Sequence, residues 1–173
     1  AALAGLDDVV VDRRMILRID RVEPSKNIVR GFAAYDRLLE TRAEWRGRVT
    51  FVALLNPSRE SLPEYLAYRQ EDEGLVARLN ERWATPGWAP IVLDESDDFP
   101  RSVAALTRYD VLLVNPVRDG LNLVAKEGPL VNRRDGVVVL SREAGVWDEL
   151  GDRAIGINPF DVAATADALD QAL

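Results

Sequence analysis

Residues 111–128 read VLLVNPVRDGLNLVAKEG, and this stretch decides the fold. The apolar run at 111–115 is typical of a buried strand. A charged pair and Gly120 follow it, and apolar residues at helical spacing come after Asn122. A strand that turns directly into a helix is the repeating unit of an α/β protein.

The same alternation recurs along the whole chain. The predicted strands are 15–20, 49–56, 90–93, 111–115, 137–141 and 154–158, and the predicted helices are 27–40, 62–83, 99–109, 122–132, 145–150 and 161–173. The strand runs are mostly continuous and apolar, as expected when helices cover both faces of a sheet. The pattern therefore predicts a doubly wound, Rossmann-like α/β fold with a mostly parallel six-stranded sheet.

The composition limits the kinds of function. The chain has no cysteine and no histidine, so thiolate and imidazole metal sites and serine–histidine catalysis are excluded, and we expect no metal and no cofactor. A net charge of −7 argues against nucleic-acid binding. No apolar stretch approaches the roughly 20 residues that span a bilayer, so we expect no membrane partner and a cytoplasmic location.

The length sets the expected domain organisation. The 173 residues suffice for one domain with a sizeable core, and no linker or repeat divides them. The last predicted helix runs to Leu173, where the chain stops. We therefore expect residues 1–173 to be a single domain excised from a larger protein.

Candidate binding residues follow the strands, because ligands bind at the carboxyl ends of the strands in an open parallel sheet. After the first strand, Arg21 and Lys26 bracket a turn stiffened by Pro24, so both cations could converge on one anion. The alternative is surface charge beside a helix that Ser25 or Asn27 caps.

The turns after the other strands carry weaker candidates. Arg59 could face a ligand, or it belongs to a plain turn before the next helix. Arg101 could contact a ring or a phosphate, or it is a solvated arginine behind a helix that begins with the cap Asp98 and Pro100. The small-residue turn at 141–145 either walls the site or is only a connection.

The turn at 118–127 carries the strongest signal. Gly120 permits a left-handed or closely approached backbone, and the amides of the following helix start would be free to meet an anion. Asp119 suits sugar hydroxyls better than phosphate. The alternative is a helix start that Asp119 merely caps. The helix-start amides belong to Leu121, Asn122, Leu123 and Val124.

The segment RDGLNLVAKE at 118–127 closely resembles the donor-binding motif of the trehalose-6-phosphate synthases. These are retaining glycosyltransferases of family 20 with the GT-B fold, which transfer glucose from UDP-glucose to glucose 6-phosphate. Further resemblances follow in order along the chain: Asp20-Arg21 with Lys26, 44–49, 56–59, 63–65, 140–145 and 158–161.

The resemblance implies a role for each candidate. Arg21 and Lys26 would hold the diphosphate of a UDP- or GDP-glucose donor, and Asp119 would bind hydroxyls of its sugar. The backbone from Gly120 to Val124 would meet the sugar and the diphosphate, and Glu127 would bind the ribose. The leaving phosphate is thought to help deprotonate the acceptor in such enzymes, so this half requires no protein base.

The resemblance also implies a partner domain, and the sequence departs from the pattern of the family at some positions. It covers the C-terminal, nucleotide-sugar-binding half, so an N-terminal acceptor domain would be missing, and the fragment alone is expected to be inactive. Self-association is a further expectation for the full-length enzyme. Asn27 replaces the usual glycine, Leu121 replaces methionine, and Gly128-Pro129 replaces a bulky pair.

Three alternative functions stay open at this point. One is a pseudo-glycosyltransferase that acts on aminocyclitols, and another is a module that senses a nucleotide sugar without converting it. The third is a different doubly wound nucleotide-binding protein, but the chain lacks the glycine-rich loops of dinucleotide binders and of nucleotide triphosphatases.

Overall fold

The computed structural model describes all residues except 1–4, 7, 9, 11 and 59–61. Its sheet contains β1 (Arg14–Arg21), β2 (Val49–Asn56), β3 (Ile91–Asp94), β4 (Val111–Val114), β5 (Val137–Ser141) and β6 (Ile155–Ile157). The α-helices are α2 (Ile28–Thr41), α3 (Pro63–Trp83), α4 (Phe99–Arg108), α5 (Leu123–Val131), α6 (Trp147–Leu150) and α7 (Val162–Ala172). Single 3-10 turns are η1 (Pro24–Lys26), η2 (Ala43–Trp45) and η3 (Gly151–Arg153).

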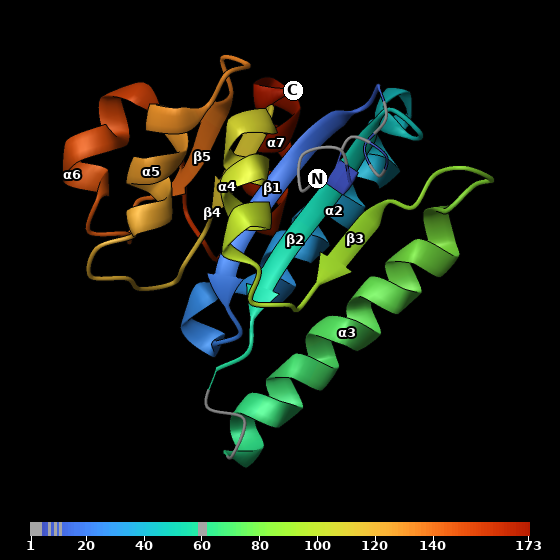
Figure 1. Ribbon diagram of the computed structural model, residues 1–173, viewed down its shortest axis with the longest axis horizontal. Coiled ribbons are helices and arrows are strands. Elements are labelled where there is room, and N and C mark those ends of the chain that lie inside the picture. The colour runs from blue at the N-terminus through green and yellow to red at the C-terminus, as the bar shows by residue number, and fades with distance from the viewer. Residues whose placement is uncertain (1–4, 7, 9, 11, 59–61) are drawn as a thin grey trace.

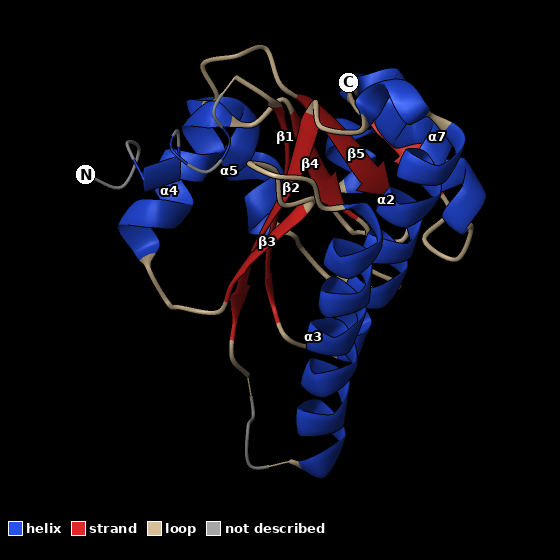
Figure 2. Cartoon of the chain, turned by 90° about the vertical axis from the view of Figure 1, so that its right-hand side faces the viewer, coloured by secondary structure: helices blue, strands red, loops and turns tan. Residues whose placement is uncertain are grey.

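The strands form one sheet in the order β3-β2-β1-β4-β5-β6, and every pairing between the described strands is parallel. Helices α4 and α5 cover one face and α2, α3 and α7 cover the other (Figures 1 and 2). The predicted doubly wound α/β fold is confirmed. The predicted element bounds differ from the observed ones by one or two residues.

Two apolar layers hold the helices to the sheet. Because successive strand side chains point to opposite faces, Ile16 packs toward α2 while Met15 and Leu17 pack toward α4. Phe51 packs edge-on against the rings of Phe32 and Tyr35 from α2, with ring centroids 5.3 and 5.4 Å apart. Burial on both faces explains why the strands read as continuous apolar runs.

A helical turn lies ahead of β1, where the sequence predicted no element. Residues 5, 6, 8 and 10 are helical, and Leu6 and Val10 are fully buried in the layer that contains Met15. A turn this short gives too few positions for a periodic pattern to be recognised in the sequence.

The glycine in the unusual Gly128-Pro129 pair has a packing explanation. A Cβ atom at Gly128 would lie 2.6 Å from the Leu112 side chain and 3.4 Å from the ring of Tyr109. Tyr109 is fully buried, so α5 can pack this closely on the sheet only with glycine at that position.

Helix α3 carries a buried acid that has no hydrogen-bond partner among the described residues. Asp72 is 1% exposed, and among the described residues neither of its carboxylate oxygens has a hydrogen-bond partner. Burial raises the pKa of Asp72 to about 7, although the nearby Arg18 opposes this. The folded protein therefore binds a proton that the unfolded chain releases at the same pH.

We predict that Asp72 makes the protein less stable as the pH rises. The folded pKa lies above the unfolded value of 3.8, so the free energy of unfolding should fall between pH 4 and about 7 by at most about 1.4 kcal/mol per pH unit. Urea unfolding at pH 5 and pH 8 measures this loss. It should be smaller in Asp72→Asn and unchanged in Glu81→Gln, because Glu81 is exposed on the same helix and does not act on Asp72. Equal pH dependence in wild type and Asp72→Asn would contradict the prediction.

Candidate functional site

The candidate site lies at the carboxyl ends of β1 and β4, where the strand order reverses. The helices that follow these strands, α2 and α5, lie on opposite faces of the sheet, so the two loops diverge (Figure 2). A hollow of about 370 Å³ lies at this point. Its lining residues are Ile19, Asp20, Arg21, Lys26, Asn56, Asp119, Leu121, Asn122, Leu123 and Val124.

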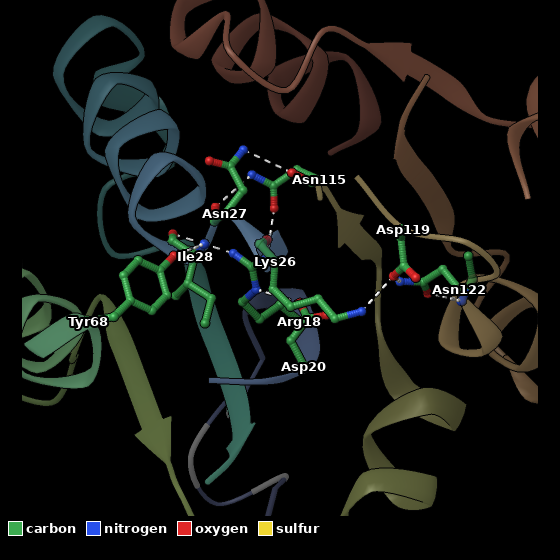
Figure 3. Close-up of polar contacts among 10 residues, drawn as sticks. Arg18, Asp20, Lys26, Asn27, Ile28, Tyr68, Asn115, Asp119 and Asn122 are labelled. Carbon is green, nitrogen blue, oxygen red and sulfur yellow. Dashed lines mark hydrogen bonds and ion pairs between the residues drawn. The ribbon is translucent and has the colours of Figure 1, made fainter. Parts of the chain in front are cut away.

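The guanidinium of Arg18 organises the floor below this hollow. Arg18 lies in β1, is fully buried, and donates to the Asp20 carboxylate at 3.0 Å. It also donates to the Lys26 carbonyl at 2.9 Å and to the Asn115 side-chain carbonyl at 2.8 Å (Figure 3). One side chain therefore fixes the turn after β1 against the end of β4.

Asn27 joins the two loops at their base. Its φ of 60° is left-handed, which asparagine tolerates better than most residues and which explains why glycine also suits this position. Its amide donates to the carbonyls of Asn115 at 2.9 Å and Pro159 at 2.8 Å. The expected capping role of Asn27 is therefore wrong: it occupies the N-cap position of α2, but its side chain makes no capping bond.

Lys26 and Asp119 form an ion pair at the surface of the hollow. The Lys26 ammonium lies 2.5 Å from the Asp119 carboxylate, and their side chains are 12% and 18% exposed. The Asn122 amide donates to the same carboxylate oxygen at 3.1 Å (Figure 3). A cation and an acid from loops 93 residues apart are thus both held at the surface of the hollow.

These contacts keep Asp119 charged. Burial acts to raise the pKa of Asp119, but the hydrogen bond and charge of Lys26, together with the bonds from Asn122 and the Leu121 amide, outweigh it and lower the pKa. Burial raises the pKa of the neighbouring Asp20, against the opposing charges of Arg18 and Lys26. Asp119 is therefore the acid prepared to accept hydrogen bonds as a carboxylate.

A second hollow of about 290 Å³ adjoins the first, because Ile19, Asn56 and Val124 line both. Its walls are mostly apolar, with Glu127 as one of two acids. The other lining residues are Asp97, Phe99, Ser102, Val103, Leu106 and Val131. A hollow lined by two cations and two acids thus adjoins a mostly apolar one that contains Glu127.

The structure brings together most of the predicted site residues. Arg21, Lys26 and Asp119 line the first hollow with residues 121–124, and Glu127 lines the second. Arg21 is 59% exposed and pairs with Glu23 at 2.9 Å.

Of three further basic residues in these turns, two have partners away from the hollows. Arg101 lines neither hollow and pairs with Asp94 at 2.9 Å, so the structure does not bring it to the site. Arg59 lies outside the described residues. Lys126 points to Glu149, with their charged atoms 2.7 Å apart.

The capping residues of α4 and α5 test the alternatives in which Asp98 and Asp119 cap helices. Asp98 caps α4 as predicted, with its carboxylate accepting from the Arg101 amide at 3.0 Å. The cap of α5 is Asn122, which accepts from the Ala125 amide at 3.0 Å, so the alternative that Asp119 caps this helix is wrong. The carboxylate of Asp119 is thereby left facing the hollow.

The backbone of Gly120 has open space where a side chain would lie. Its φ is not positive, so of the two possibilities the left-handed backbone is wrong, and a Cβ atom there would meet nothing within 4 Å. The close approach occurs at Gly145, where a Cβ atom would collide with the Gly120 carbonyl, while the Gly145 amide donates to the Asp119 carbonyl at 2.9 Å. The turn at 141–145 thus supports the Asp119 loop directly.

Sequence reasoning missed Arg18 and Asn115, the two residues that order the floor. A signal was present, because an arginine within the apolar run MILRI is unusual for a strand buried on both faces. Its position two residues before Asp20 places both side chains on the same face of the strand.

Two further searches concern the described part of the chain. Within it, no three acidic, histidine or cysteine side chains gather as a metal site would require. No helix in that part is long and apolar enough to cross a membrane.

Comparison with known proteins decides the family. The model of glycosyltransferase family 20 matches residues 4–173. The chain belongs to glycosyltransferase family 20. The resemblance seen in the sequence is confirmed, and so is the fold it implies.

Members of this family resemble the chain in sequence and in structure. A bifunctional trehalose-6-phosphate synthase/phosphatase of Thermoproteus tenax is 38% identical over 99% of this chain and 24% of its own length. The α,α-trehalose-phosphate synthase (UDP-forming) of Burkholderia xenovorans, solved with glucose-6-phosphate, superimposes with a TM-score of 0.95 at 35% identity over 100% of this chain and 39% of that one.

A third relative carries a donor analogue. The trehalose-6-phosphate enzyme of E. coli, bound with UDP-2-fluoro glucose, superimposes with a TM-score of 0.92 at 33% identity, covering 98% of this chain and 38% of that one. The chain therefore spans about a quarter to two fifths of the length of these relatives.

We predict that Gly145 and Gly120 respond oppositely to alanine. Gly145→Ala places a methyl group against the Gly120 carbonyl, so the loop must shift and the free energy of unfolding should fall by about 1–3 kcal/mol. Gly120→Ala meets open space and should change it by less than about 0.5 kcal/mol. Chemical unfolding of both variants checks this, and a Gly145→Ala protein as stable as wild type would refute the close contact.

Proposed function

We propose that this chain is the donor-binding half of an α,α-trehalose-phosphate synthase. The complete enzyme would transfer glucose from a nucleotide diphosphate glucose, UDP-glucose first, to glucose 6-phosphate with retention of configuration. The observation that carries the proposal is the division of groups between two adjoining hollows: one has mostly apolar walls and Glu127, and the other has Arg21, Lys26 and Asp119. The first would suit the base and ribose of the donor, and the second its diphosphate and sugar.

The hollow that contains Lys26 and Arg21 suits the diphosphate. Lys26 supplies an ammonium group on a side chain that is 12% exposed, and Arg21 supplies a guanidinium from the other side of the turn. Helix α5 begins at Leu123, so its first amides have no partner within the helix, and the positive end of its dipole faces the hollow. All three would stabilise the charge that grows on the diphosphate as the glycosidic bond breaks.

The carboxylates suit hydroxyl groups. Asp119 would accept hydrogen bonds from the donor sugar, and its lowered pKa keeps it ionised for that role. Lys26 bonds Asp119 at 2.5 Å, so donor binding would bring the diphosphate to Lys26 and the sugar to its partner carboxylate. Glu127 would accept from the ribose, and the apolar walls would hold the flat base.

The relatives support the remaining parts of the proposal. The solved neighbours are described with glucose-6-phosphate and with UDP-2-fluoro glucose, and several relatives are called UDP-forming. The chain matches only part of each, so an N-terminal acceptor domain would complete the cleft. In the proposed reaction the departing phosphate accepts the proton of the acceptor hydroxyl, so this half needs no base of its own. Cytoplasmic location and self-association stay predictions.

We predict that Lys26 and Glu127 are required for nucleotide binding. Lys26→Ala removes a charged hydrogen bond to the diphosphate, and Glu127→Ala removes the ribose contact, so each should weaken UDP binding about tenfold or more. Calorimetric titration with UDP, GDP, ADP and their glucose conjugates measures this.

The adjacent Lys126→Ala is the matched control, because Lys126 pairs with Glu149 away from the hollows. Arg101→Ala should also bind UDP normally, because Arg101 pairs with Asp94. Wild-type UDP binding with no loss in Lys26→Ala and Glu127→Ala would remove the site assignment.

Turnover separates an enzyme from a nucleotide-sugar sensor. We expect the chain joined to an N-terminal half from its family to form trehalose 6-phosphate from UDP-glucose and glucose 6-phosphate. Asp119→Asn should lower the rate while the protein stays folded. A two-domain protein that binds the donor and forms no product would instead favour the sensing alternative.

A further inference from the structure

A larger hollow lies at the opposite ends of the strands, where β1 and β2 begin. Its volume is about 540 Å³. β1 runs from Arg14 to Arg21, so its whole length separates this hollow from the donor site, at the strand ends away from the arrowheads in Figure 1. Four of its seven lining residues are arginines, although the chain has a net charge of −7. The lining residues are Asp12, Arg13, Arg14, Trp45, Gly47, Arg48 and Arg134.

Two of these arginines compete for one carboxylate. The guanidinium groups of Arg14 and Arg134 approach the same Asp110 oxygen at 3.0 and 3.4 Å. Arg108 lies 3.8 Å from the other oxygen, which also accepts from the Met15 amide at 2.8 Å. Asp110 is therefore already saturated, and it cannot neutralise the arginines that converge on it.

The other two arginines form no ion pair with an acid among the described residues. Arg13 donates to the backbone carbonyls of Gly47 at 3.1 Å and Gly87 at 2.7 Å, which carry no net charge. Arg48 is exposed, and no hydrogen bond or ion pair within the described chain engages its guanidinium. Counted over the described residues, the four lining arginines face two acids, Asp12 and Asp110, which leaves two positive charges unmatched.

An aromatic wall completes the hollow. Trp45 is held by the hydrogen bond from its indole nitrogen to Asp170 at 2.8 Å, and it packs on the core from η2. Gly47 beside it has a φ of +74° and no side chain, which leaves the rim open. An aromatic surface beside two unmatched guanidinium charges suits a small organic phosphate, because arginine forks match phosphate oxygens.

We propose that this hollow is a second, non-catalytic site that binds a small phosphate monoester. The dianionic phosphate lies between Arg48 and the paired Arg14 and Arg134, and the organic part lies against Trp45. The two unmatched charges set the charge of the ligand, and the volume of about 540 Å³ sets its small size. The site does not depend on the donor hollow or on the reaction proposed for it.

The test is calorimetric titration of the chain with inorganic phosphate and phenyl phosphate at low ionic strength. Saturable binding is expected, about tenfold weaker in Arg48→Ala and in Arg134→Ala, since each loses a charge-assisted hydrogen bond. The guanidinium of Arg48 makes no hydrogen bond or ion pair with the described residues, so Arg48→Ala should melt at the wild-type temperature without ligand. Phenyl phosphate should lose its advantage over inorganic phosphate in Trp45→Leu.

Two controls make the result decisive. Arg78→Ala removes an exposed arginine on α3 and should leave phosphate binding unchanged. Lys26→Ala should also leave it unchanged, because Lys26 belongs to the donor hollow. Absence of saturable binding, equal affinity in wild type and Arg48→Ala, or loss of all binding in Lys26→Ala would each overturn the proposal.

Discussion

The buried guanidinium of Arg18 is the interaction on which the site depends. It bonds groups from β1, from the turn after β1 and from the end of β4, and it sits where a Cβ atom on Gly31 would have to be. Breaking a buried charged network leaves its partners unsatisfied, which is costly. The position of Lys26 above the floor therefore follows from a residue that no ligand needs to touch.

Much of the fold could be predicted because its determinants are local. The strand runs are apolar on both faces and α2 has a clear apolar stripe, so periodicity finds both. The short turn before β1 and the left-handed Asn27 could not be found this way. Asn27 bonds Pro159, 132 residues away, and such a partner leaves no trace in its own neighbourhood.

The sequence predicted some residues of the candidate site and not others. Lys26 and Asp119 could be named because polar residues that follow parallel strands gather at one end of the strands. Glu127 was named from the family resemblance of residues 118–127. Arg101 fails the same reasoning, since strand ends predict the edge but not the direction of a side chain, and Asp94 holds it. Most apolar walls of the second hollow were missed because Val103 and Val131 look like ordinary helix residues in the sequence.

The contact between Gly145 and Gly120 has a consequence for engineering. The loop that carries Asp119 rests on a turn that comes a whole helix and strand later, with an amide bonded to its backbone. A chimera that imports only residues 118–127 from a relative would seat the new loop on a foreign support. Donor preference should therefore transfer between family members only when 118–127 and 141–145 are exchanged as a pair.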